Sequence, residues 1–292
     1  MKSWLIRLAP FVFVLLWSTG YIGAKFGLPY IEPFTFLFIR LIVAMVLLAV
    51  LAAVLRQRWL EKLEWQHASI AGLLLHAGYL GGVFSAIKLG MPAGLSAIIV
   101  NLQPVLTSSF AAFLLKEKIT QRQWLGLILG FIGVALAILE KTTGIFHENI
   151  PIWGIIAAFI ALFSSTFGTI YQKRFAQNIP LLTGTAVQYA ASSLVFLIAA
   201  LAFEKRIIIW NTTLLWTMLW FIVIISLGAI LLLLWLIRQN STTQVSSLFY
   251  LVPPFTALEA YLLFGEQLGI LAILGLALTM FGVGLVVTEG KP

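Results

Sequence analysis

Long apolar segments alternate with short polar linkers along the whole chain. A helix that crosses a bilayer needs roughly 20 predominantly apolar residues. Ten segments meet this requirement: 8–28, 33–55, 67–89, 94–115, 122–139, 152–172, 180–203, 212–237, 242–264 and 268–288. The linkers between them leave no room for a soluble domain. The pattern therefore predicts an all-α integral membrane protein with ten transmembrane helices.

Composition supports this prediction and removes several kinds of chemistry. The 292 residues are 61% hydrophobic and 10% charged, whereas a soluble domain carries about 25% charged residues. There is no cysteine, so disulfides and cysteine metal sites are excluded. All ten acidic residues are glutamate and no P-loop is present, which argues against aspartate-based and ATP-driven mechanisms. We expect no cofactor.

The basic residues predict the orientation in the membrane. With both termini in the cytoplasm, twelve lysines and arginines fall on the inner side and five on the outer side. This distribution obeys the positive-inside rule. The net charge of +8 is thus explained by the linkers, and no nucleic-acid partner is expected. We expect an integral protein of the bacterial inner membrane, in contact with the lipid bilayer, with both termini cytoplasmic.

The second half of the chain repeats the first half at an offset of 149 residues. Residues 94–136 match residues 243–285, and the aligned pairs include Pro104 with Pro253, Glu117 with Glu266, and Gly126 with Gly275. We predict two five-helix repeats, 1–141 and 150–292. Five is an odd number, so the repeats have opposite orientations in the membrane. Inverted repeats with matching broken helices are typical of secondary transporters.

The same residues resemble a known family. The stretches "LLWSTGYIGAKFGLPYIEPFTFLFIRLIVA" and "LGMPAGLSAIIVNLQPVLTSSFAAFLLKEKITQRQWLGLILGFIGVAL", with the echo "PPFTALEAYLLFGEQLGILAILGLALTMFGVGL", are similar to the EamA-type branch of the drug/metabolite transporter superfamily. The most telling positions are Trp17, Lys25, Pro33, Arg40, Pro104, Glu117, Gly126, Pro253 and Glu266. The resemblance implies a ten-helix fold, alternating access, and the outward movement of amino acids, nucleobases and related metabolites.

Proline residues break two spans near the expected centre of the bilayer. Pro104 frees one backbone carbonyl, and Pro253 and Pro254 free two more. Such carbonyls must face protein or a wet cavity, so we expect a substrate cavity between the halves; the alternative is a kink capped by nearby hydroxyls. The candidate substrate-binding residues share this depth: Trp17, His76, Tyr79, Asn101, Gln103, Ser164, Tyr189 and Tyr250. Core packing or back-bonding to the helix is the alternative for each aromatic or hydroxyl group.

His76 is the one histidine in the interior of a predicted span. A histidine can exchange protons near neutral pH, and ionisable groups inside membranes are functional candidates. The alternative is a neutral imidazole that bonds across helices. Coupling to protons and facilitated diffusion both remain compatible with the sequence.

Three charged residues, Lys25, Arg40 and Glu259, lie in the outer part of the predicted membrane region. Unpaired charges at this depth are costly. We expect a clamp that closes the outer side, above all between Arg40 and Glu259. The alternatives are attraction of a substrate carboxylate and snorkelling to the surface.

Further positions are expected to serve packing and helix ends. Glu117 and Glu266 end repeat-related spans and are expected to cap the next helix. The patterns Gly78-x-x-x-Gly82 and Gly126-x-x-x-Gly130 predict close helix packing.

The favoured function is a secondary transporter, expected to export small metabolites by alternating access. Amino acids, aromatic ones included, are the favoured substrates because the candidate lining is aromatic, hydroxylic and almost uncharged. A nucleotide-sugar or sugar-phosphate carrier would need more cations than Lys25 and Arg40. A membrane-embedded lipid-modifying enzyme would need a catalytic cluster that is absent from the sequence, so we do not expect an enzyme. A gated channel is disfavoured by the inverted broken helices.

Overall fold

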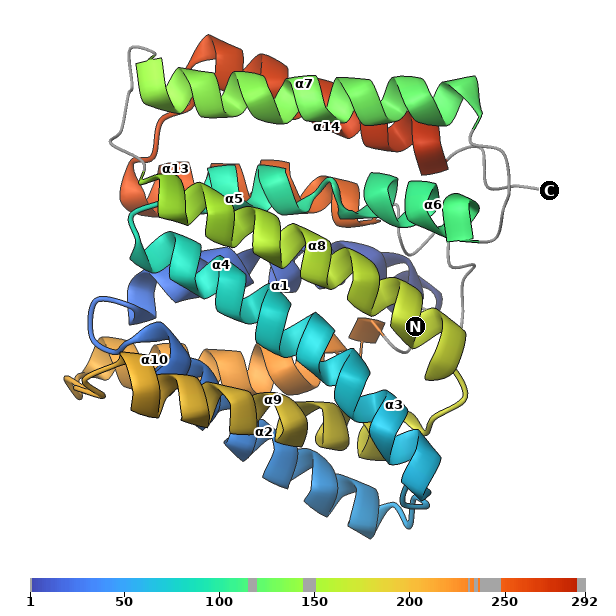
Figure 1. Cartoon of the computed structure of the whole chain (residues 1–292). Coiled ribbons are helices and arrows are strands. Elements are labelled where there is room, and N and C mark those ends of the chain that lie inside the picture. The colour runs from blue at the N-terminus through green and yellow to red at the C-terminus, as the bar shows by residue number, and fades with distance from the viewer. Residues whose placement is uncertain are drawn as a thin grey trace.

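The structure, a computed structural model, describes residues 2–114, 120–143, 151–230, 232–233, 236 and 248–287 (Figure 1). These residues form helices joined by short linkers. The elements are α1 (Lys2–Gly27), α2 (Pro33–Val54), α3 (Lys62–Gly72), η1 (Leu73–Gly78), α4 (Tyr79–Lys88), α5 (Ala93–Val100), α6 (Gln103–Leu114), α7 (Gln121–Thr143), α8 (Ile152–Phe175), α9 (Leu181–Phe203), α10 (Thr212–Leu219), η2 (Trp220–Ala229), η3 (Phe249–Leu251), α13 (Val252–Phe264) and α14 (Ile270–Val287).

Six helices in the described ranges are long and apolar enough to cross a membrane, and four more apolar helices are shorter. The long ones are Leu8–Gly27, Pro33–Val54, Lys62–Lys88, Ile152–Phe175, Leu181–Phe203 and Thr212–Ala229. The shorter ones are Ala93–Thr107, Trp124–Glu140, Val252–Phe264 and Ile270–Gly282. Together they coincide with the ten predicted spans, which confirms the predicted fold class.

Local sequence sets the helix starts. Pro33 occupies the first turn of α2, where its missing N–H costs nothing and its fixed φ suits a helix. Pro92, Pro151 and Pro180 directly precede α5, α8 and α9. Asn211 begins α10 by accepting a hydrogen bond through Oδ1 from the Leu214 N–H at 2.8 Å.

Helices from the two halves pack in repeat-related pairs. In Figure 1, α7 and α14 lie side by side at one edge of the bundle. In the repeat, α1 corresponds to α8 and α13 corresponds to α6. The contact of α1 with α13 has its counterpart in the contact of α8 with α6. The helices α2 and α9, another repeat-related pair, also pack against each other. These pairings agree with two inverted copies of one five-helix unit.

Glycines bring the repeat-related helices α7 and α14 into backbone contact. A Cβ at Gly133 would lie 2.4 Å from the carbonyl oxygen of Gly275, and a Cβ at Gly282 would lie 2.6 Å from that of Gly126. Gly126 corresponds to Gly275, and Gly133 corresponds to Gly282, so the two contacts are copies of one another. Close packing at the Gly126-x-x-x-Gly130 segment is therefore as predicted.

The other predicted glycine pair brings α4 against α8. A Cβ at Gly78 would lie 2.4 Å from the Ser164 hydroxyl, and a Cβ at Gly82 would lie 2.6 Å from the carbonyl oxygen of Ala157. No side chain larger than hydrogen fits at either position without moving α8.

Two spans contain a stretch of π-helix that their hydrophobic pattern does not reveal. The third span passes from α3 through η1 into α4, and the eighth passes from α10 into η2. These spans are repeat counterparts, so the irregular turn occurs in both halves. π-Helical turns are rare and often mark functional positions.

Glutamates join the halves at the helix ends on the predicted outer side. Glu204 accepts hydrogen bonds from the N–H groups of Phe34 and Thr35 at the start of α2, at 2.6 and 2.8 Å. Glu140 accepts from the Leu271 N–H at the start of α14, at 3.2 Å. Each carboxylate thereby meets the positive end of a helix dipole.

Glu266 caps a different helix from the one predicted. Its Oε1 accepts a 3.4 Å hydrogen bond from the Ala93 N–H at the start of α5. The next helix in the chain, α14, is capped by Glu140 instead. The expectation that Glu266 caps the following helix was therefore wrong, because tertiary packing places the start of α5 nearer. Glu117 lies outside the described residues.

Candidate functional site

The π-helical turn η1 places His76 at the middle of the third span. Its Nε2 lies 3.1 Å from the Oε1 of Gln188 on α9, and the Gln188 amide donates to the Oε1 of Gln172 on α8 at 3.0 Å. The His76 ring also meets the Tyr189 ring edge-on, with centroids 4.8 Å apart. A chain of hydrogen bonds thus joins three helices at this level of the bundle.

Arg40 is 4% exposed and has partners within the protein. Its Nε donates to the Ser226 hydroxyl on η2 at 3.0 Å, and its guanidinium lies 4.5 Å from the centre of the Phe221 ring. The Tyr189 hydroxyl donates to the Ser226 carbonyl at 3.3 Å, which links this group to the His76 chain. Arg40 therefore connects α2 with η2 and α9.

Trp17 and Tyr79 belong to an aromatic group on α1 and α4. The Tyr79 hydroxyl lies 3.4 Å from that of Tyr21. Trp17 packs against the rings of Phe13 and Phe249, with centroids 5.3 and 5.5 Å away. Both predicted residues thus sit at helix contacts in the interior of the bundle, Trp17 beside the start of η3.

The broken fourth span carries Asn101 and Gln103. The chain leaves α5 at Asn101 and enters α6 at Gln103, and Pro104 is the second residue of α6. Asn101 is 6% exposed, and its Nδ2 is buried with no hydrogen-bond partner. Gln103 donates to the Thr169 hydroxyl on α8 at 2.8 Å. Of the two amides, Asn101 keeps its donor available.

The other broken span is interrupted at its repeat-related position. The short η3 turn, Phe249–Leu251, leads into α13, where Pro253 and Pro254 occupy the first turn. Tyr250 belongs to η3, and its side chain lies outside the described part of the structure. Ser164 lies on α8 directly against Gly78 at the end of η1, so it serves the η1–α8 contact.

The outer charges are arranged differently from the expected clamp. Arg40 and Glu259 form no ion pair with each other: Arg40 bonds to Ser226, and Glu259 accepts from the Ser18 hydroxyl on α1 at 2.8 Å. Lys25 instead pairs with Glu266 and lies 4.6 Å from the centre of the Phe264 ring. The clamp partners were wrong because depth along a span does not reveal which way a side chain points around its helix.

Two bonds join α1 to the segment that contains α13: Glu259 lies on α13, and Glu266 lies two residues beyond its end. We call this contact, with Ser18 and Lys25 on one side and Glu259 and Glu266 on the other, the α1–α13 seam. In the predicted orientation, Lys25 and Glu266 lie towards the outer side, and Ser18 lies at the centre of its span. The seam thus joins the two halves of the protein from the expected centre of the bilayer towards the predicted outer side.

Three of these partners were absent from the residues that the sequence indicates for the cavity, namely Gln172, Ser226 and Tyr21. Ser226 left the clearest signal, because it is the one polar side chain in the apolar segment "WFIVIISLGA". Gln172 and Tyr21 stand near span ends or beside other polar groups, and no local pattern distinguishes them.

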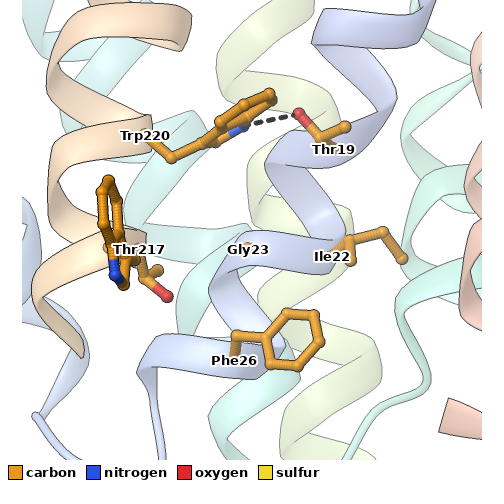
Figure 2. Close-up of a pocket in the computed structure, with 7 residues that line it drawn as sticks. Thr19, Ile22, Gly23, Phe26, Thr217 and Trp220 are labelled. Carbon is orange, nitrogen blue, oxygen red and sulfur yellow. Dashed lines mark hydrogen bonds between the residues drawn. The ribbon is translucent and has the colours of Figure 1, made fainter. Parts of the chain in front are cut away.

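A cavity of about 250 Å³ lies between α1 and the α10–η2 segment (Figure 2). It is lined by Thr19, Ile22, Gly23, Phe26, Trp216, Thr217 and Trp220. Trp216 is 67% exposed, and the Trp220 indole donates to the Thr19 hydroxyl at 3.0 Å. The cavity therefore opens at the exposed surface between α1 and the α10–η2 segment, and its described lining includes none of the predicted substrate-binding residues.

Comparison with a family model decides the identity of the fold. The model described as the EamA-like transporter family matches residues 4–139 and again residues 152–288. The chain belongs to the EamA-like transporter family. The two matches coincide with the two halves of the fold, so each half carries the family pattern. The chain is thus an integral membrane protein of a transporter family.

Individual relatives align with this EamA-like transporter over nearly its whole length. It is 27% identical to the uncharacterized transporter YvbV of Bacillus subtilis, over 95% of this chain and 90% of the relative. It is 26% identical to the probable amino-acid metabolite efflux pump of Salmonella typhimurium, over 92% and 90%. It is 28% identical to the uncharacterized inner membrane transporter YedA of Escherichia coli, over 97% and 90%.

A solved crystal structure shares the fold. It aligns with a TM-score of 0.65 over 95% of this chain and 94% of the other, at 20% sequence identity. At this level of identity the likeness concerns the fold alone.

Proposed function

We propose that this EamA-like transporter is a secondary exporter of small amino-acid metabolites, aromatic amino acids included, and that it works by alternating access. The observation that carries the proposal is the pair of repeat-related broken spans, together with the buried, unpartnered amide nitrogen of Asn101 at the break in the first of them. Matching broken helices at the junction of inverted repeats are the usual place for a transported substrate.

The repeat relation supports a central location for this amide. Gly94 of α5 faces Ala257 of α13, with 3.6 Å between a Cβ built on Gly94 and the Cα of Ala257. In the repeat, Ala257 corresponds to Ser108, so Gly94 of one copy meets the counterpart of Ser108 in the other copy. Two related segments that pair in this way cross at the midpoint of positions 94 and 108, which is Asn101. An axis relating the two halves then passes beside Asn101 and its counterpart Tyr250. A donor on this axis is equally near to both halves, as alternating access requires.

The surroundings favour a small zwitterion or neutral amphiphile. The polar groups near this level are amides, an imidazole, tyrosines and hydroxyls. The two cations that would attract a polyanion are already engaged, Lys25 by Glu266 and Arg40 by Ser226 and Phe221. These pairings argue against a nucleotide-sugar or sugar-phosphate carrier. The name of the Salmonella typhimurium relative supports amino-acid metabolites as the substrate class.

Counterflow in proteoliposomes tests the proposal. Vesicles loaded with one unlabelled amino acid should transiently accumulate the labelled amino acid from outside, and the exchange should saturate. Electrical conductance without exchange would instead indicate a channel, and exchange confined to phosphorylated sugars would indicate the other carrier class.

Asn101 offers a direct check on the location of the substrate. Asn101→Leu keeps most of the side-chain volume and removes the amide, which should raise the half-saturating concentration by roughly tenfold for one lost hydrogen bond. Gln57→Leu is the matched control, because Gln57 is an exposed amide in the linker between α2 and α3. Equal half-saturating concentrations in both variants would remove Asn101 from the site.

A further inference from the structure

Glu259 stands apart from the other glutamates that join helices. Glu140, Glu204 and Glu266 each accept hydrogen bonds from backbone N–H groups, and Glu266 also pairs with Lys25. The Oε1 of Glu259 is hydrogen-bonded to the Ser18 hydroxyl, while its Oε2 is buried without a partner. Its repeat-related position in the first half is Phe110, so no symmetry of the fold requires an acid here.

The hydroxyl partner has an unusual position between two acceptors. Ser18 is fully buried, and its Oγ lies 2.9 Å from the Leu15 carbonyl oxygen and 2.8 Å from Glu259 Oε1. A serine hydroxyl has one hydrogen, and a carbonyl oxygen only accepts. If Ser18 donates to Leu15, then its bond with Glu259 requires a proton on the carboxyl group. If Glu259 is ionised, Ser18 turns its hydrogen to the carboxylate.

Ser18 can therefore serve Glu259 in both protonation states, but burial favours the protonated one. An ionised carboxylate in the membrane region costs several kcal/mol unless its oxygens are paired. With the α1–α13 seam closed, Oε2 has no donor. Separation of α1 from α13 would admit water, which hydrates the ionised form.

Among the described residues of the elements that pack on α13, no charged side chain pairs with Glu259. On α1, Lys25 is seven residues beyond Ser18, about 10 Å along the helix, and it is paired with Glu266. Tyr21, also on α1, bonds to the Tyr79 hydroxyl. Helix α5, which also packs on α13, contains no titratable residue between Ala93 and Val100. The η3 turn packs on α13 as well and carries Tyr250, whose side chain lies outside the described residues. For the described residues, the protonation of Glu259 thus depends chiefly on whether the seam is open.

We propose that Glu259 is a proton-binding site that couples protonation to closure of the outer side. A proton from water on the outer side adds to the Glu259 carboxylate, the neutral carboxyl is buried against Ser18, and the seam closes. When the seam opens, the proton returns to water. Because the proton is taken from and returned to water on the same side, the site makes closure of the outer side depend on the outer pH and moves no proton across the membrane. This inference rests on the proposed alternating access, and it assigns the pH-sensitive group to Glu259 rather than to His76.

A cysteine in the seam reports on this closure. Ala260, next to Glu259, is buried in the same cluster as Tyr21 and Ile22, and the natural chain has no cysteine to interfere. In Ala260→Cys protein, we expect an impermeant thiol reagent to react faster as the pH rises. The reaction rate of Phe203→Cys serves as the reference, because Phe203 is 81% exposed at the predicted outer end of α9. Dividing by this reference rate corrects for the pH dependence of the thiol reaction itself. One linked proton allows up to roughly a tenfold change per pH unit.

Four further variants test whether Glu259 is the group whose protonation closes the seam. Glu259→Gln mimics the protonated carboxyl and should give a low rate that no longer depends on pH. Glu259→Asp keeps a titrating group and should keep the dependence, which guards against a misfolded glutamine variant. Glu64→Gln is the matched control and should behave as the parent, because Glu64 is a half-buried acid that pairs with the exposed Arg58. If His76→Gln rather than Glu259→Gln removes the dependence, or if the parent shows none, the proposal is wrong.

Transport separates this inference from the proposed function. Glu259→Gln should retain substrate counterflow but lose the dependence of its rate on the pH outside the vesicles. Counterflow in the parent together with an unchanged dependence on outer pH in Glu259→Gln would overturn the proton site alone. Absence of counterflow in the parent, with the pH-dependent thiol reactivity intact, would overturn the transport proposal alone.

Discussion

Replacing Lys25 with glutamine removes the positive charge from the α1–α13 seam and shortens the side chain by only one atom. The side chain of Lys25 is 35% exposed, whereas that of Glu266 is only 8% exposed. After the replacement, the remaining bond from the described residues to the Glu266 carboxylate is the long one from the Ala93 N–H. The seam is thus left with a buried negative charge that lacks its cation.

The expected magnitude lies between two measured limits. Exposed ion pairs contribute about 0–1 kcal/mol, and removing one partner of a fully buried pair costs about 3–5 kcal/mol. With one partner a third exposed and the other buried, we expect about 1–2 kcal/mol. Because about 1.4 kcal/mol is a factor of ten, the ratio of outer-closed to outer-open protein should fall by roughly fivefold to thirtyfold.

The reaction of Ala260→Cys with an impermeant thiol reagent measures this ratio at constant pH. Lys25→Gln should raise the rate, Glu266→Gln should raise it similarly, and the double variant should add little, because each single change already breaks the pair. The exchanged pair Lys25→Glu with Glu266→Lys should restore part of the low rate. Arg58→Gln, which breaks the exposed pair with Glu64, is the control. Equal rates in all variants would refute the role of this pair in closing the seam.

Three further predictions follow from packing, from the aromatic group and from charge. Gly282→Ala should lower the midpoint of unfolding in detergent by the equivalent of about 1–3 kcal/mol, because the new methyl meets the backbone of α7. Gly284→Ala, where no atom lies within 4 Å of the new Cβ, should leave the midpoint unchanged. Trp17→Ala should weaken counterflow by roughly tenfold if its ring contributes about 1.4 kcal/mol to substrate binding, and normal transport at parental protein levels would exclude it. Single cysteines at Lys2 and Lys291 should resist impermeant reagents in whole cells, and labelling of either from outside would reverse the predicted orientation.

The fold was predictable from the sequence because membrane spans and repeats leave one-dimensional signals. Apolar length indicates the spans, and the match of Pro104 with Pro253 indicates related breaks in both halves. The pattern Gly126-x-x-x-Gly130 predicted a close helix contact, although the sequence did not identify α14 as the partner. These features need only the order of residues along the chain.

The charge partners were not predictable in the same way. Depth along a span placed Lys25, Arg40 and Glu259 at one level, yet the rotation of each helix and the identity of its neighbours decide which groups meet. Arg40 therefore bonds to Ser226, 186 positions away in the chain, and Lys25 to Glu266. The π-helical turns that present His76 and Ser226 were also missed, because a single widened turn hardly changes the hydrophobic pattern.

The central claim is that substrate crosses only while the α1–α13 seam can open and close. Its most direct test is amino-acid counterflow by the Lys25→Cys/Glu266→Cys protein before treatment, after joining of the two thiols by a short reducible cross-linker, and after reduction. We predict saturable exchange that stops on cross-linking and returns on reduction, while the same reagent leaves the cysteine-free parent unaffected. Exchange that continues unchanged with the seam fully cross-linked would contradict the account.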